Sequence, residues 1–306
     1  MSSTRKRDFD TADSPEDLLV GLAPVRHHQS DQAGVGLIDS REEVRVPTRP
    51  APRPGPARPA HGGVPADPDG VQVSTQVTRE FDAGAPRYDL LVGLNPGYHA
   101  HLDTAAEALA EGVPAPERLI DLGCGSGAST RALLRAFGER VAILGVDASA
   151  GMLAQAQAKE WPDSVAFTPG RAGELDALLH APVDGILAAY LFRNVPEGQR
   201  DEALADALAA LNPGGTLVVL EYSVAGDPRA QRVWRTVCRA VVRPLARLTG
   251  ANPALYTYLE RSVLEFDTVE AFCDRMQGVG FAGVESRTVT GWQRGILHII
   301  RARRPR

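Results

Sequence analysis

From Val73 onward, short apolar runs alternate with segments in which apolar residues recur every three or four positions. The runs have the length of buried strands, and the periodic segments have the length of amphipathic helices. Strands are expected at 118–122, 141–146, 165–168, 183–188, 216–221, 282–288 and 295–301. Helices are expected at 128–137, 150–159, 175–179, 197–211 and 268–277, with a helical excursion over about 227–262. This alternation predicts a parallel sheet with helices on both faces.

Residues 1–73 lack this alternation and carry scattered acids, Ser and Gly. Between Pro47 and Pro59, prolines alternate with arginines. Closely spaced prolines remove backbone donors and favour extended polyproline II, so this segment cannot bury a core. We therefore expect a disordered, Pro/Arg-rich tail at 1–73 and one domain over 74–306. A docking arm for an acidic or SH3-like partner is the alternative for the tail.

The composition is that of an ordinary globular protein, with 43% hydrophobic and 23% charged residues among 306. The net charge of −5 gives no overall attraction to nucleic acid or anionic lipid. Three cysteines, Cys124, Cys238 and Cys273, are too few and too far apart for a disulfide framework or a spaced zinc site. Without an export signal or a long apolar run, the sequence indicates a cytoplasmic, metal-free protein.

A glycine cluster directly follows the apolar strand expected at 118–122. Gly123, Gly125 and Gly127 open the helix behind them, so the backbone can approach a ligand and offer unpaired N–H groups to it. Asp147 ends the second expected strand, 20 residues after Gly127. An acid at that place can accept hydrogen bonds from a ribose diol. The two features together predict an adenosine-containing cofactor.

The spacing of the glycines selects among such cofactors. It is Gly-x-Gly-x-Gly, whereas a pyrophosphate-containing dinucleotide favours Gly-x-Gly-x-x-Gly. The chain also holds only two lysines, Lys6 and Lys159, so it has no lysine for the Tyr-x-x-x-Lys pair of short-chain dehydrogenases. Both observations favour S-adenosyl-L-methionine over NAD.

At these residues the chain resembles the class I S-adenosylmethionine-dependent methyltransferases. The resemblance is carried by Asp121-Leu122-Gly123-Cys124-Gly125-Ser126-Gly127, Val146-Asp147-Ala148-Ser149 and Leu211-Asn212-Pro213-Gly214-Gly215. It implies a Rossmann-like three-layer α/β sandwich whose mostly parallel seven-stranded sheet has an antiparallel last strand, with a helical insertion after the fifth strand.

Further stretches are similar to the ubiquinone/menaquinone biosynthesis C-methyltransferases, over about 77–301. They are Phe81-Asp82 with Tyr88-Asp89, Arg193-Asn194-Val195, Leu220-Glu221-Tyr222-Ser223, and the Tyr256-x-Tyr258-Leu259-x-x-Ser262-Val263 pattern. The resemblance implies a cofactor site made of Asp121, Gly123, Gly125, Gly127, Thr130, Asp147, Ala148, Met152, Arg171 and Ala172. Arg171 departs from the family's Asp or Asn, so adenine recognition there must use the backbone. Ala189 also departs, because the quinone enzymes often carry Ser at that position.

The residues expected at the acceptor follow the fourth strand. Arg193 and Asn194 can stabilise an oxyanion on the acceptor ring, although the arginine can instead pair with an acid. A guanidinium stays protonated, so the candidate proton acceptors are His99, Asp89 and Glu221. His99 can also be a packing residue. Tyr88, Tyr190 and Tyr256 are candidate walls of the site, with a place in the core as the alternative.

The excursion after the fifth strand contains a basic amphipathic stretch at 229–248. Arginines recur at three- and four-residue steps, and apolar residues occupy the other side. Two interpretations stay open: peripheral contact with the inner face of a membrane, or a cap over the active site with its arginines in water. We expect 222–267 to form this substrate cap.

The sequence thus predicts a methyltransferase that uses S-adenosyl-L-methionine and acts on a quinol or another isoprenoid, lipid-like acceptor at carbon. The alternative is O-, N- or C-methylation of an unrelated small metabolite, because acceptor pockets diverge while the cofactor half stays. A nucleic-acid substrate is disfavoured by the acidic charge and the lack of an Asn-Pro-Pro-Tyr type motif. A regulatory protein that binds the cofactor without turnover is the remaining class.

Overall fold

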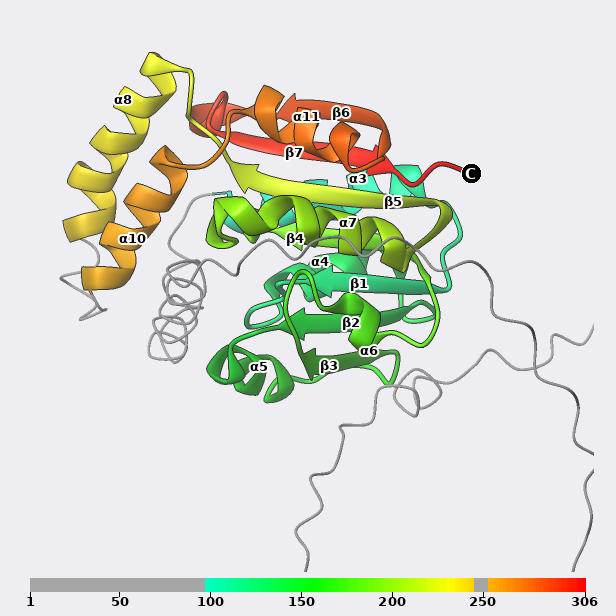
Figure 1. The fold of residues 1–306 in the computed structure, drawn as a ribbon. Coiled ribbons are helices and arrows are strands. Elements are labelled where there is room, and N and C mark those ends of the chain that lie inside the picture. The colour runs from blue at the N-terminus through cyan, green and yellow to red at the C-terminus, as the bar shows by residue number, and fades with distance from the viewer. Residues whose placement is uncertain (1–96, 245–252) are drawn as a thin grey trace, which may run out of the picture. The chain divides into compact units, whose positions relative to one another are not determined.

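The computed structural model describes residues 97–244 and 253–306. Its seven-stranded sheet has the order β3-β2-β1-β4-β5-β7-β6 (Figure 1). The strands are β1 Arg118–Leu122, β2 Ala142–Asp147, β3 Val165–Pro169, β4 Val183–Ala189, β5 Leu211–Tyr222, β6 Ala282–Thr288 and β7 Leu297–Arg303. Neighbouring strands from β3 to β5 are parallel, and β7 runs antiparallel to both β5 and β6. The predicted Rossmann-like sheet, with its antiparallel last strand, is confirmed.

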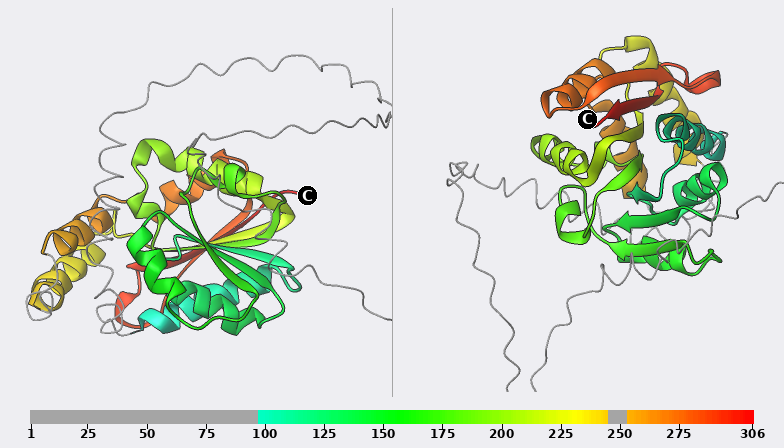
Figure 2. Two further views of the ribbon diagram at one scale, coloured as in Figure 1. Left: turned by 90° about the horizontal axis from the view of Figure 1, so that it is seen from below. Right: turned by 90° about the vertical axis from the view of Figure 1, so that its right-hand side faces the viewer.

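Helices cover both faces of this sheet (Figure 2). The α-helices are α3 Tyr98–Gly112, α4 Ala128–Phe137, α5 Ala150–Gln157, α6 Leu175–Leu178, α7 Arg200–Ala210, α8 Pro228–Val237, α10 Pro253–Leu264 and α11 Val269–Gly278. Short 3-10 turns are η1 Phe192–Asn194, η2 Glu197–Gln199 and η4 Gly291–Gln293, and η3 Cys238–Val242 is a π-helix that continues α8.

The core has two layers because successive strand residues point to opposite faces. On one face Leu119 of β1 belongs to a cluster with residues of α3 and α4, such as Leu109 and Leu133. On the other face Ile120 belongs to a cluster with residues of α7 and α11, such as Leu204. The central strands β1, β4 and β5 are therefore buried on both sides, which explains why they appear as apolar runs in the sequence.

Helix α3 is not among the helices that the sequence predicts. Its inward face combines Tyr98, Leu102 and Leu109 with alanines, and Ala105 and Ala106 are fully buried. Alanine carries little apolar surface, so this face gives a weak periodic signal although its spacing is helical. The helix nevertheless packs against α4 and β5.

The predicted helix 197–211 is shorter than expected. It splits into the 3-10 turn η2 and helix α7, which ends at Ala210. The Asn212-Pro213-Gly214-Gly215 stretch, predicted to close that helix, belongs to β5 instead. The pairing of Leu211 with Val183 draws this stretch into the sheet, and Gly214 and Gly215 exchange backbone hydrogen bonds with Arg304.

The helical excursion after β5 consists of α8, η3 and α10 in the part of the chain that the structure describes. Capping side chains explain where α8, at the start of the excursion, and α11, directly after it, begin. The side chain of Asp227 accepts hydrogen bonds from the first turn of α8, and Thr268 accepts one from Ala271 at the start of α11.

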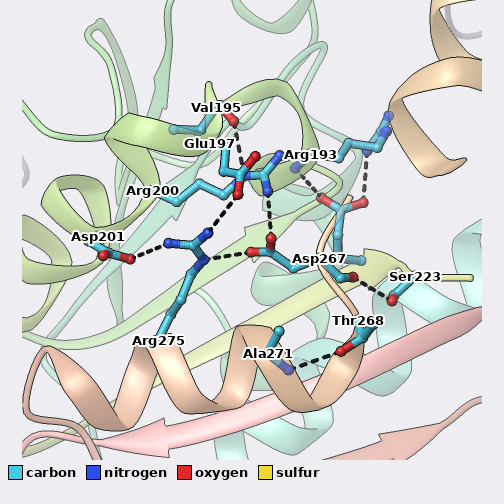
Figure 3. Close-up of polar contacts among 11 residues, drawn as sticks. Arg193, Val195, Glu197, Arg200, Asp201, Ser223, Asp267, Thr268, Ala271 and Arg275 are labelled. Carbon is cyan, nitrogen blue, oxygen red and sulfur yellow. Dashed lines mark hydrogen bonds and ion pairs between the residues drawn. The ribbon is translucent and has the colours of Figure 1, made fainter. Parts of the chain in front are cut away.

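Asp267 anchors the end of this excursion to the sheet-bearing part of the fold (Figure 3). Its carboxylate receives hydrogen bonds from Arg200 Nη1 at 2.9 Å and from Arg275 Nε at 2.8 Å. Its carbonyl oxygen accepts from Ser223 Oγ at 2.8 Å, close to where the excursion leaves β5. Arg200 is almost fully buried and also donates through Nε to the carbonyl oxygen of Val195.

We expect Asp267→Ala to lower the free energy of unfolding by about 3 kcal/mol, because it leaves the buried Arg200 guanidinium without its counter-ion. Asp201→Ala is the matched control: Asp201 pairs with the same Arg275 but is 61% exposed. Its loss should cost less than about 1 kcal/mol. Urea denaturation of both variants measures the difference, and equal losses would show that the Asp267 cluster does not hold the excursion.

Candidate active site

A cavity of about 480 Å³ lies at the carboxyl ends of β1, β2 and β4. In parallel sheets of this kind, ligands bind at that edge. Nine of the residues predicted for the site line it: Gly123, Gly125, Asp147, Ala148, Met152, Arg171, Ala172, Arg193 and Asn194. The structure therefore brings most of the predicted cofactor and acceptor residues to one cavity.

The turn between β1 and α4 brings bare backbone to this cavity. Gly123 and Gly125 have φ values of +76° and +53°, a region that residues with a Cβ rarely adopt. The amides of Gly123 and Cys124 both donate to the carbonyl oxygen of Val146, at 2.7 and 3.0 Å. These bonds hold the turn against the end of β2. Gly127 lies outside the cavity, where a Cβ would meet the Trp161 ring at 2.8 Å.

Asp147 ends β2 at the cavity wall and is held in place by two backbone amides. Its carboxylate accepts from Gly125 N and from Ser149 N, both at 2.8 Å. A carboxylate has about four acceptor positions, which suits the two neighbouring hydroxyls of a ribose. Ser149 also caps α5 by accepting from Met152 N, which fixes the helix that carries Met152 into the cavity.

Asp121 lies behind the glycine turn and is fully buried. One carboxylate oxygen accepts from the hydroxyls of Ser129 and Thr130. Burial raises the pKa of Asp121 to about 7, although these two hydrogen bonds oppose the shift. The other oxygen has no hydrogen-bond partner in the part of the chain that the structure describes. Neither Asp121 nor Thr130 lines the cavity, whereas Ser129 does. The hydroxyl of Thr130 therefore acts by donating a hydrogen bond to Asp121 and not by contacting a ligand in the cavity.

These residues fit the adenosine-containing cofactor expected from the sequence. The glycine turn is a cradle that a Cβ would fill, since Cβ atoms at Gly123 and Gly125 would meet Leu191 and Met152 at 3.0 Å. Asp147 offers acceptors for a ribose. Arg171 and Ala172 line the cavity where the resemblance implies adenine.

On the acceptor side, the backbone of Tyr190 follows β4 in a strained conformation. Its φ is +58°, and no other non-glycine residue in 97–244 and 253–306 has a positive φ. Such a conformation costs about 1–3 kcal/mol, and the surroundings must enforce it. Tyr190 N donates to Leu220 O at 2.7 Å, while the Tyr190 carbonyl oxygen accepts from Arg193 Nη1 at 2.6 Å and from Asn194 Nδ2 at 3.0 Å.

Arg193 forms a buried ion pair with Glu221, the interaction that the sequence leaves open as an alternative to oxyanion stabilisation. The Nη1–Oε1 distance is 2.9 Å, and the two side chains are 7% and 0% exposed. Glu221 also accepts from the backbone amides of Arg193 and Tyr222. Glu221 does not line the cavity, so it orders this turn from behind.

Three aromatic rings pack together beside this turn, and two of them, Tyr98 and Tyr190, line the cavity. The Tyr190 ring stacks on Tyr98 with centroids 5.4 Å apart and lies against Tyr222 at 5.2 Å. Tyr98 and Leu102 of α3 line the cavity, and sequence reasoning misses both because it misses α3. The aromatic Tyr98 at the head of an alanine-rich segment is the signal that could have found them.

His99 is not brought to this cavity. It is exposed and lines a separate pocket of about 250 Å³ with Gly127, Arg131, Arg135, Lys159 and Trp161. Asp89, Tyr88 and the side chain of Tyr256 lie outside the described residues. Within 97–244 and 253–306, no three His, Cys, Asp or Glu side chains gather as metal ligands would.

Known proteins match this chain over most of its length. The model of the ubiE/COQ5 methyltransferase family matches residues 71–301. The demethylmenaquinone methyltransferase of Mycolicibacterium paratuberculosis is 31% identical over 232 residues, which are 75% of this chain and 94% of that protein. A ubiquinone/menaquinone biosynthesis C-methyltransferase of Methylobacterium nodulans is 29% identical over 221 residues, 71% of this chain and 86% of that protein.

Among solved structures, magnesium protoporphyrin IX methyltransferase of Synechocystis PCC 6803 with bound SAH aligns with a TM-score of 0.54. The alignment covers 76% of this chain and 99% of that one at 16% identity, so this likeness concerns the fold. The match to the family model includes the glycine turn, the Tyr190–Asn194 turn and the excursion after β5. The chain therefore belongs to the ubiE/COQ5 methyltransferase family.

Proposed function

We propose that this S-adenosylmethionine-dependent methyltransferase transfers a methyl group to a ring carbon of a quinol or another isoprenoid, lipid-like acceptor. The observation that carries the proposal is the extent of the family match, which includes the acceptor side of the cavity as well as the glycine turn. The names of relatives at about 30% identity, demethylmenaquinone methyltransferase and ubiquinone/menaquinone biosynthesis C-methyltransferase, support the same acceptor class.

The cofactor residues would act by binding and orientation. S-adenosylmethionine, when bound, supplies a methyl group on a positively charged sulfur. Gly123 and Gly125 let the backbone approach it, Asp147 accepts the ribose hydroxyls, and the backbone at Arg171 and Ala172 serves the adenine. Such a transfer needs mainly alignment of the acceptor, so a rigid cradle is worth more here than a strong nucleophile.

The acceptor residues would hold a flat ring and order the wall beside it. Tyr98 and Tyr190 offer aromatic surface at the cavity, which suits an aromatic quinol. Arg193 and Asn194 line the same side and converge on the carbonyl oxygen of Tyr190. Because Glu221 neutralises the guanidinium, we assign Arg193 chiefly to positioning this turn.

We also propose that the surface of α8 and η3 contacts a membrane from one side, as a lipid-like acceptor requires. The sequence expects Val233 and Val241 on the apolar side, but they are 36% and 54% exposed, beside the exposed Arg235 and Arg239. Trp234 and Cys238 face inward instead. Exposed apolar residues among arginines are typical of a helix that rests on an anionic lipid surface. No helix in 97–244 or 253–306 is long and apolar enough to cross a bilayer.

The acceptor assignment is tested with labelled S-adenosylmethionine and a reduced, demethylated menaquinone that bears a short prenyl chain. We expect label in the product, on a ring carbon, as mass spectrometry of its fragments can locate. The same incubation with the oxidised quinone is the control, because loss of the phenolic electron density should abolish the reaction. Label on oxygen, or none with the quinol while another metabolite is methylated, would refute the quinol C-methyltransferase.

Asp147→Asn should weaken binding of S-adenosylhomocysteine by at least about tenfold, because the amide loses one of the two acceptors for the ribose diol. The melting temperature should fall only slightly, since the remaining oxygen can still accept from Gly125 N while Ser149 N loses its acceptor. Isothermal calorimetry measures the affinity. An affinity equal to that of the wild type would remove Asp147 from the cofactor site.

Reversal of two charges tests the membrane contact. Arg235→Glu with Arg239→Glu should lower co-sedimentation with vesicles containing phosphatidylglycerol by at least about tenfold, because each basic residue near an anionic surface contributes roughly 1 kcal/mol. The matched control is Arg287→Glu with Arg303→Glu, which makes the same change in charge at exposed residues on β6 and β7. Equal binding by the two double variants would rule out the α8 surface as the contact.

A further inference from the structure

Tyr258 on α10 reaches the turn beside the cavity through a single hydrogen bond. Its hydroxyl donates to Asn194 Oδ1 at 3.0 Å. The other end of the same amide, Asn194 Nδ2, donates to the Tyr190 carbonyl oxygen at 3.0 Å. The two bonds fix which way the amide faces, since each end has a partner of the opposite kind. Asn194 lines the cavity, but Tyr258 does not.

The turn that Tyr258 touches needs such support. Tyr190 is held at a positive φ, and donors from Arg193 and Asn194 both act on its carbonyl oxygen. If the Asn194 amide rotates, one of these two clamps is lost and the strained residue can relax. A change at Tyr258 therefore reaches the cavity wall through only one intermediate side chain.

Helix α10 is itself held to the rest of the excursion. Arg243, directly after η3, forms an ion pair with Glu260 of α10 at 2.7 Å, and Trp234 Nε1 donates to the carbonyl oxygen of Glu260. Beyond its end, Asp267 is fixed by Arg200 and Arg275 (Figure 3). The position of Tyr258 thus depends on how the whole excursion is seated.

We propose that Tyr258 is a positioning residue that links the seating of the excursion after β5 to the acceptor side of the cavity, through the Asn194 amide and the Tyr190 carbonyl. The proposal rests on the proposed acceptor site. Burial raises the pKa of Tyr258, so its hydroxyl stays protonated and continues to donate at any working pH. Unlike the residues of the cavity wall, Tyr258 would act without touching the acceptor.

Tyr258→Phe removes the hydroxyl and keeps the ring. We expect kcat for the quinol to fall about tenfold, which is the usual size of one lost hydrogen bond. The KM for the quinol and the affinity for S-adenosylhomocysteine should stay within about twofold of the wild type, since Tyr258 lines neither part of the cavity. Hydrogen exchange at the amides of 190–195 should become faster.

Two further variants separate positioning from mere packing. Asn194→Ala combined with Tyr258→Phe should lose no more activity than Asn194→Ala alone, because both act through one amide. Ser262→Ala breaks a hydrogen bond within α10, to Leu259 O, and should leave both kcat and the exchange at 190–195 unchanged.

Additive losses, an unchanged kcat in Tyr258→Phe, or an equal loss in Ser262→Ala would each overturn the role of Tyr258. If the wild type does not methylate the quinol, the proposed acceptor is refuted. Hydrogen exchange at 190–195 still measures whether Tyr258 supports the turn. Unchanged exchange at 190–195 in Tyr258→Phe would then refute the link as well.

Discussion

The buried ion pair between Glu221 and Arg193 is the interaction on which the acceptor side depends. Glu221 is the second-last residue of β5 and is fully buried, so an unpaired carboxylate there would be costly. Arg193 neutralises it and, with the same Nη1 atom, donates to the carbonyl oxygen of Tyr190. The buried ion pair thereby fixes the guanidinium that holds Tyr190 at its positive φ, a conformation that would otherwise be unfavourable. The sheet thus supports this wall of the cavity through Glu221.

The central strands could be predicted well because they are buried on both faces. The runs 118–122 and 183–188 match the bounds of β1 and β4 to within one residue, and the glycine turn marks the start of α4. Two features escaped prediction for physical reasons. Helix α3 buries mainly alanine, and the beginning of β5 is set by pairing with β4, which is a tertiary contact.

The cofactor half of the site could be predicted better than the acceptor half. Spacing alone places Gly123, Gly125 and Asp147 at one sheet edge, because a turn after β1 and the end of β2 must be neighbours. Which residue contacts Asn194 depends on a side chain far away in the sequence, because its partner Tyr258 lies on α10. The ion pair of Arg193 with Glu221 is another example: the sequence offers both residues, and only the fold pairs them. His99 shows the reverse case, a residue of suitable chemistry on the wrong side of α3.

The excursion after β5 leaves and rejoins the fold at almost the same point, because Ser223 Oγ and the Asp267 carbonyl oxygen are 2.8 Å apart. Its two ends are therefore held at one place, and between them Trp234 and Cys238 pack in the same core cluster as Tyr222 of β5. A loop closed at its base can change in length at little entropic cost. An insertion in the part of the excursion that lies away from this core would therefore leave the nucleoside-binding edge of the sheet untouched.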